Sequence, residues 1–76
     1  MTKYNIKLNT FTDVKAFCDN VSKVAGPVDL SHGKYCIDAK SLMGIYALDL
    51  SNVLTIECRD EDAAALEEAI KNWRVD

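Results

Sequence analysis

Apolar and polar residues alternate in two segments of the chain, and each alternation predicts a β-strand. Every second residue is apolar from Lys3 to Asn9, and the pattern returns from Val53 to Cys58. Successive side chains of a strand point to opposite faces, so both strands should have one buried face and one wet face. The side chains expected on the buried faces are Tyr4, Ile6, Leu8, Leu54, Ile56 and Cys58.

After the first strand, the apolar spacing changes to that of a helix. Thr10 and Asp13 fit the acidic form of a capping box, and the helix is expected over residues 11–23. The sequence Ala25-Gly26-Pro27 should end it, with glycine just past the end and proline unable to continue the helix. The apolar stripe of this helix is expected to be Val14, Phe17, Cys18, Val21 and Val24.

A second long helix is predicted after the last strand. It should begin at Arg59-Asp60-Glu61-Asp62, where the positive end of the helix dipole stabilises the acidic side chains. Glu67 and Lys71 have the spacing of a favourable i,i+4 ion pair. The apolar stripe of this helix is expected to be Leu66, Ala69, Ile70 and Trp73.

Two shorter alternations, Val28–Ser31 and Tyr35–Asp38, lie between the long helices. The turn between them contains Gly33, which can adopt a positive φ, so we expect a hairpin. With a short helix over residues 41–48, the predicted order is β-α-β-β-α-β-α. Strands with one wet face and helices with one apolar stripe predict an α+β fold, an antiparallel sheet covered on one side by helices.

The short helix carries more apolar residues than one face can bury. Ile45 and Leu48 should anchor it, and Ser41 stands at the N-cap, where its hydroxyl can accept a hydrogen bond from the first turn. The surplus apolar side chains are interpreted either as core packing or as a protein-docking surface. They are Leu42, Met43 and Tyr46.

Composition narrows the class of protein. The chain is one ordinary globular domain, residues 1–76, with 49% hydrophobic and 28% charged residues. Its net charge of −3 provides no basic surface for nucleic acid or for an anionic membrane. No signal peptide and no apolar run of about 18 residues is present, so a cytoplasmic protein is expected, with neither membrane nor nucleic acid as a partner.

The cysteines and histidine do not form a metal-binding pattern. Cys18, Cys36 and Cys58 are odd in number and lie in apolar patterns, so they are expected to be buried free thiols. There is no Cys-x-x-Cys pair, and His32 is the single histidine, so no metal site is expected. No glycine-rich phosphate loop is present, and we expect no cofactor.

The residues that could carry chemistry do not predict an enzyme, because no nucleophile stands beside a base. His32 is expected to be a polar turn residue, the alternative being an acid-base or phosphorylated histidine. Ser41 is either a plain N-cap or a phosphorylation site. A phosphoryl group there would lie at a helix N-terminus, with Lys40 as a nearby cation and Asp38 opposing it.

The segment Lys40-Ser41-Leu42-Met43-Gly44-Ile45, continued by Leu48, resembles the Lys-Ser-Ile-Met-Gly-Val segment of HPr, the histidine-containing phosphocarrier of the bacterial sugar phosphotransferase system. Ser22-Lys23 also matches that family, at the same distance. The resemblance covers roughly residue 14 to the C-terminus. It implies an open-faced β-sandwich, in which three helices cover one face of a four-stranded antiparallel sheet.

The same resemblance places the family's phosphorylated histidine at Thr10, and the arginine and proline of its motif at Thr12 and Asp13. None of the three is retained. A phosphothreonine would not replace the histidine, because a phosphate ester is too stable for ready relay. The resemblance therefore implies a divergent, non-enzymatic relative without phosphohistidine carrier activity.

What the resemblance does imply is a role for Ser41. In Gram-positive relatives a dedicated kinase phosphorylates the matching serine, the modified protein binds a transcriptional regulator, and the short helix docks partners. The leading hypothesis is an HPr-like regulatory or protein-interaction module whose partner is a kinase, a regulator or a phosphotransferase component. Its docking residues would be Lys40, Leu42, Met43 and Tyr46.

Two other hypotheses stay open. The first is a phosphocarrier that uses a non-standard residue, for which His32 is the candidate. The second is a small scaffold that dimerises through the short helix. The expected oligomeric state is a monomer or a weak homodimer.

Overall fold

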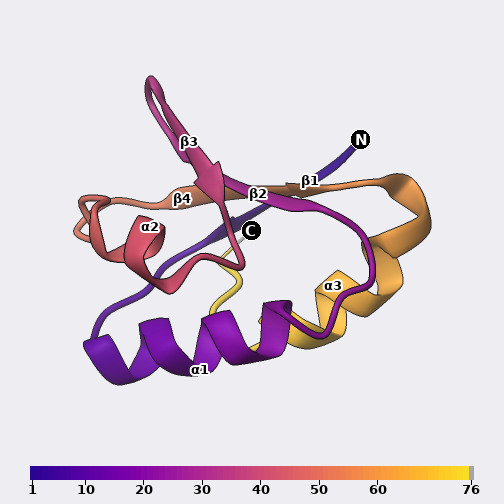
Figure 1. Cartoon of the computed structure of the whole chain (residues 1–76), viewed down its shortest axis with the longest axis horizontal. Coiled ribbons are helices and arrows are strands. Elements are labelled where there is room, and N and C mark those ends of the chain that lie inside the picture. Colours follow the sequence, from indigo (N-terminus) through magenta and orange to yellow (C-terminus); the bar gives the residue numbers. More distant parts are fainter. Residues whose placement is uncertain (76) are drawn as a thin grey trace.

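The computed structural model describes residues 1–75, in which an antiparallel sheet lies over a layer of helices (Figure 1). The order of elements is the predicted one. Its members are β1 (Thr2–Ile6), α1 (Phe11–Val21), β2 (Val28–His32), β3 (Tyr35–Asp38), α2 (Leu42–Tyr46), β4 (Leu54–Cys58), the 3₁₀ turn η1 (Asp60–Asp62) and α3 (Ala63–Ile70).

The four strands are arranged in the order β1-β4-β2-β3, and every neighbouring pair is antiparallel. One row of side chains crosses the sheet through Tyr4, Ile56, Leu30 and Ile37. Strands β4 and β2 are central, whereas β1 and β3 form the two edges. The sheet is therefore the predicted four-stranded antiparallel sheet, with its helices on one face.

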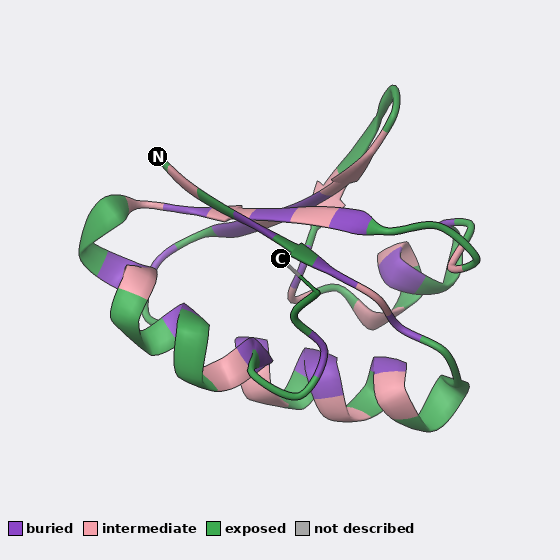
Figure 2. Ribbon diagram, turned by 180° about the vertical axis from the view of Figure 1, so that it is seen from behind, coloured by how far each residue is buried: buried purple, intermediate pink, exposed green. Residues whose placement is uncertain are grey.

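The core lies between the sheet and the helices, where Figure 2 shows the buried parts of both layers facing each other. The predicted alternation of β1 and β4 is confirmed, because all six side chains assigned to their buried faces are buried. The apolar stripe of α1 is confirmed as well. In α3 and just beyond it, Leu66, Ile70 and Trp73 are buried, and Ala69 packs partly buried against the core.

The prediction that α1 extends to Lys23 is wrong by two residues, because local hydrogen bonds close the helix earlier. The Ser22 hydroxyl donates to Cys18 O, and the N–H of Lys23 bonds back to Asn20 O as a 3₁₀ turn. Gly26 does not supply a left-handed conformation. Among residues 1–75, Gly33 is the residue that adopts a positive φ, at 58°.

Gly26 is needed for space. A Cβ atom built on it would overlap the Asp62 carboxylate and would lie 2.6 Å from Nε of Arg59. Arg59 Nε donates to Asp62 Oδ2 at 2.8 Å, and this ion pair packs directly on the glycine. The absence of a side chain at Gly26 therefore lets the segment before β2 contact the start of η1.

The last helix also departs from its prediction. It begins as η1, and its acidic residues have individual partners: Asp60 accepts from Thr2 Oγ1 at 2.7 Å, and Asp62 pairs with Arg59. The expected Glu67–Lys71 pair is replaced by Lys71–Glu68 and Arg74–Glu67 pairs. The helix ends at Ile70, and the chain then returns toward β1, so Arg74 reaches Glu67 while stacking on the ring of Tyr4.

The two sheet edges differ in how they are covered. At the β1 edge, Lys7 N–H donates to Trp73 O and Val75 N–H donates to Asn5 O, so residues 73–75 cover part of it. At the β3 edge, Cys36 is exposed, which corrects the expectation that all three cysteines are buried. Cys18 and Cys58 are buried as expected.

Candidate functional site

Ser41 is the N-cap of α2, as predicted. Its backbone is extended, and its hydroxyl oxygen accepts a hydrogen bond from Gly44 N–H at 3.2 Å. The Ser41 N–H donates to Asp38 O at 2.9 Å, which fixes the chain entering the helix. The residue is exposed, so the capping hydroxyl lies at the surface.

The structure corrects the expected role of Lys40 as a cation beside Ser41. The Lys40 ammonium group donates to Val24 O at 2.6 Å and to Gly26 O at 2.9 Å, both in the loop after α1. The Asp38 carboxylate accepts from Lys40 N–H at 2.9 Å. Lys40 thus connects the segment before α2 to the loop before β2, and its charge is directed to carbonyl oxygens.

The apolar residues of α2 divide between core and surface. Ile45 is fully buried and Leu48 nearly so, which confirms both as anchors. Leu42 is half-buried and packs against the core. Met43 is 77% exposed and Tyr46 is 38% exposed, and their i,i+3 spacing places them as neighbours on the helix surface.

Phe11 joins these two residues at the surface, and the sequence interpretation missed it. It is 74% exposed, and its ring meets the ring of Tyr46 edge-on, with 5.5 Å between centroids. We call Phe11, Met43 and Tyr46 the α2 patch. The apolar pattern gives no signal for this exposure, because Phe11 continues the buried stripe of α1 three residues before Val14.

Thr10, the position matched to the family's histidine, caps α1 in the predicted capping box. Its hydroxyl accepts from Asp13 N–H at 3.1 Å. The Asp13 carboxylate in turn accepts from the N–H groups of Asn9 and Thr10, at 3.1 and 3.3 Å. An anion approaching these amides would have to displace a carboxylate of the chain itself, and would also be repelled by it.

Thr10 and Ser41 are not brought together. The start of α1 contacts the end of α2 through Phe11 and Tyr46, whereas the start of α2 lies near Cys18, whose thiol donates to Lys40 O at 3.4 Å. The two helices therefore run past each other in opposite directions. The two sites that the resemblance indicated are at opposite ends of α2.

His32 lies at the end of β2, opposite Tyr35 across the hairpin turn, and is half-buried. The pKa of the Asp49 carboxyl is lowered mainly by hydrogen bonds from the hydroxyl and N–H of Ser51, and His32 adds a smaller electrostatic contribution. No hydrogen bond between His32 and a carboxylate is present among residues 1–75, so nothing described there activates it as a base.

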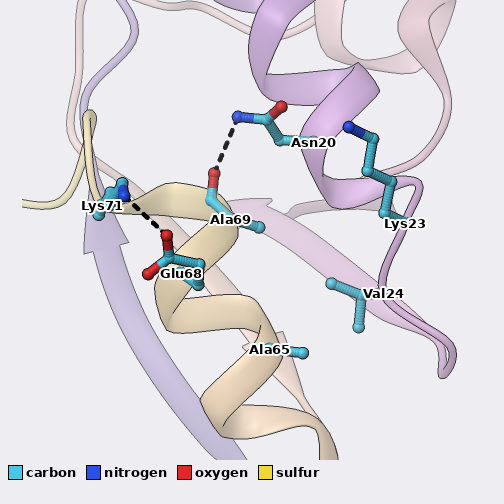
Figure 3. A pocket seen from close by; sticks show the side chains of 7 residues that line it. All are labelled: Asn20, Lys23, Val24, Ala65, Glu68, Ala69 and Lys71. Atoms are coloured by element: carbon cyan, nitrogen blue, oxygen red, sulfur yellow. Dashed lines mark hydrogen bonds and ion pairs between the residues drawn. The ribbon is translucent and has the colours of Figure 1, made fainter.

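A shallow groove of about 430 Å³ separates the end of α1 from α3 (Figure 3). Along its rim, Lys71 donates to Glu68 at 2.7 Å and Asn20 donates to Ala69 O at 3.3 Å, whereas the Lys23 ammonium group enters no hydrogen bond or ion pair among residues 1–75. A second, polar hollow lies beside the start of α1. There the Lys7 ammonium bonds to three oxygen atoms of Leu8, Asn9 and Leu50.

Metal ligands do not gather anywhere in the part of the chain that the structure describes. No group of three or more histidine, cysteine, aspartate or glutamate side chains among residues 1–75 could hold a metal ion. Over the same residues, no helix is long and apolar enough to cross a membrane.

Comparison with known proteins finds similarity among solved structures. No protein-family model matches the chain, and no curated protein matches it. Among solved structures, the chain is similar to HPr-C-His from Thermoanaerobacter tengcongensis, with a TM-score of 0.72 and 26% identity over 95% of this chain and 93% of that one. The predicted HPr-like open-faced fold is therefore confirmed.

Proposed function

We propose that this chain is an HPr-like protein-interaction module related to the phosphotransferase system, that it acts without phosphohistidine chemistry, and that it is regulated at Ser41. It docks a protein partner, such as a serine kinase, a regulator or a phosphotransferase component, through the α2 patch. It is a binding protein of the cytoplasm, not an enzyme.

The observation that carries this proposal is the exposure of Phe11, Met43 and Tyr46 beside a short helix whose serine cap is also exposed. Aromatic and methionine side chains are enriched where proteins dock. A partner that covers the rings and the thioether of the α2 patch removes their apolar surface from water. In HPr proteins the corresponding helix docks partners. Leu42 packs against the core beneath α2, and Lys40 connects the segment before α2 to the loop after α1.

The loss of phosphocarrier activity rests on the start of α1. Thr10 replaces the family's histidine, and the Asp13 carboxylate occupies amide groups that an incoming phosphoryl group would need. Enzyme I with labelled phosphoenolpyruvate should therefore leave the protein unlabelled. Label on the wild type that His32→Gln removes would instead establish the alternative phosphocarrier.

The kinase arm tests the positive part of the proposal. HPr serine kinase with ATP should place one phosphate on Ser41, detected by mass spectrometry and absent from Ser41→Ala. Met43→Ala should raise the KM for the protein by about fivefold to tenfold, since truncating an interface anchor costs on the order of 1 kcal/mol. Tyr35→Ala, which removes an equally exposed ring on the hairpin, is the matched control and should leave KM unchanged.

Either of two results would refute the proposal. No phosphate on Ser41 removes the regulatory part. Equal KM values for wild type, Met43→Ala and Tyr35→Ala remove the assignment of the docking surface.

A further inference from the structure

The outer edge of β3 offers unpaired backbone groups at the surface. Ala39 N–H donates to Val28 O at 2.9 Å, and the register places Ile37 opposite Leu30 and Tyr35 opposite His32. In an antiparallel ladder, residues alternate between exchanging hydrogen bonds with the neighbour and pointing away from it. Cys36 therefore directs its N–H and C=O groups away from β2, toward solvent. Asp38 directs its N–H the same way, whereas its C=O already accepts from Ser41 N–H at 2.9 Å.

This edge lacks the covering that the opposite edge has. Residues 73–75 bond to β1, whereas the β2–β3 hairpin projects away from the helices (Figure 1). Natural proteins commonly protect a free edge by a bulge, by proline or by inward charges. Residues 35–38 contain no proline and pair with β2 without a bulge, and Tyr35 and Cys36 are exposed there.

The residues along β3 are complementary to themselves under a two-fold rotation. If Cys36 lies opposite Cys36 of a second copy, Tyr35 lies opposite Ile37, and Lys34 lies opposite Asp38. Each dimer would contain the Lys34–Asp38 pair twice. Cross-strand pairs of opposite charge, and of an aromatic with a β-branched residue, stabilise antiparallel ladders.

The isolated chain leaves both of these charges without an opposite partner. Asp38 lies directly opposite Asp29 on β2, a like-charge arrangement that destabilises a ladder. Neither Asp29, Asp38 nor Lys34 enters an ion pair among residues 1–75. Lys34 of a second copy would supply the missing cation beside Asp38.

From this self-complementarity we infer that β3 is a homodimerisation edge, which joins two copies into one continuous eight-stranded sheet centred on Cys36. The interface is small, and the dimer is therefore weak. It uses the sheet edge and leaves the α2 patch free, so it is independent of the function proposed above.

Charge exchange tests the inference by sedimentation equilibrium of the full chain. Asp38→Lys should weaken association by at least about tenfold, because it places two lysines opposite each other at both ends of the interface. The change in net charge alone predicts the reverse, since the chain moves from −3 toward neutrality. The double variant Lys34→Asp with Asp38→Lys should restore association, because the attractive pairs re-form with their signs exchanged.

Lys71→Asp is the matched control for a lysine reversal on α3, and it should not change association. A wild type that stays monomeric at millimolar concentration would overturn the inference. So would an Asp38→Lys variant that associates as strongly as the wild type, or a double variant that fails to recover.

Cross-linking gives an independent readout of the register. Hydrogen-bonded antiparallel pairs place Cα atoms about 5.5 Å apart, within the range that a disulfide spans. Copper-catalysed air oxidation should join Cys36 to Cys36 at least about tenfold faster than it joins the thiols of a Cys36→Ser, Lys71→Cys variant, which meet by collision alone. Equal rates would contradict the pairing, while the buried Cys18 and Cys58 contribute little to either reaction.

Discussion

Replacing Lys40 by methionine separates a structural from a docking role for this side chain. The change keeps most of the aliphatic stem and removes the ammonium group, which donates to Val24 O at 2.6 Å and to Gly26 O at 2.9 Å. Hydrogen bonds that involve a charged group contribute about 1.5–3 kcal/mol each. Lys40 is half-buried, so water compensates part of the loss, and we expect destabilisation of about 2 kcal/mol.

Urea unfolding measures this change directly. With a slope of about 1 kcal/mol per molar urea, at the low end expected for a small domain, the midpoint should fall by about 2 M. Lys23→Met is the matched control, because the Lys23 side chain is exposed and makes no hydrogen bond or ion pair among residues 1–75. An unchanged midpoint for Lys40→Met would refute the structural role, and would return Lys40 to the set of candidate docking residues.

Two further predictions concern the start of η1. Gly26→Ala should lower the free energy of unfolding in urea by about 2 kcal/mol, because the added methyl group displaces the Arg59–Asp62 pair, in which the Asp62 side chain is only 9% exposed. This loss should shrink by more than half in a chain where both Arg59 and Asp62 are alanine. An equal loss there would contradict this cause. The Asp60 carboxyl has a pKa below its ordinary 3.8, mainly because Thr2 donates a hydrogen bond to it and secondarily because of the Met1 amino group. Its contribution to stability is therefore complete above about pH 5 and disappears as the pH falls through the lower folded-state pKa. Asp60→Asn should reduce the pH dependence of the unfolding free energy between about pH 5 and about pH 2. An unchanged dependence on pH would exclude this carboxylate as its source.

The sequence predicted the fold well where the determining contacts are local. Alternation in β1 and β4, the stripe of α1 and the Thr10–Asp13 capping box each depend on residues a few positions apart, and all are confirmed. Element ends were predicted less well, because distant partners set them. The last helix begins as η1, for example, where Arg59 and Asp62 pack onto Gly26.

The candidate site shows the same division. The Ser41 cap joins residues only three positions apart and could be predicted. Lys40 is adjacent to Ser41 in sequence, but its ammonium group bonds to a loop some fifteen residues away. Cys36 differs from Cys58, because it shares its face of the strand with Asp38 and lies opposite Ser31, whereas Ile37 continues the core row through Leu30. Its exposure follows from this face of the sheet, so the alternation within Tyr35–Asp38 already separated Cys36 from the core.

The pairing of β1 with β4 also has a consequence for how the chain folds during synthesis. Thr2 lies opposite Cys58, and Lys7 bonds to Trp73, so β1 acquires its partners only after β4 and residues 73–75 have been synthesised. Until β4 emerges, Tyr4 and Ile6 have no neighbouring strand. Long-range pairing of this kind slows folding, so the sheet cannot form around β4 until that strand has been synthesised.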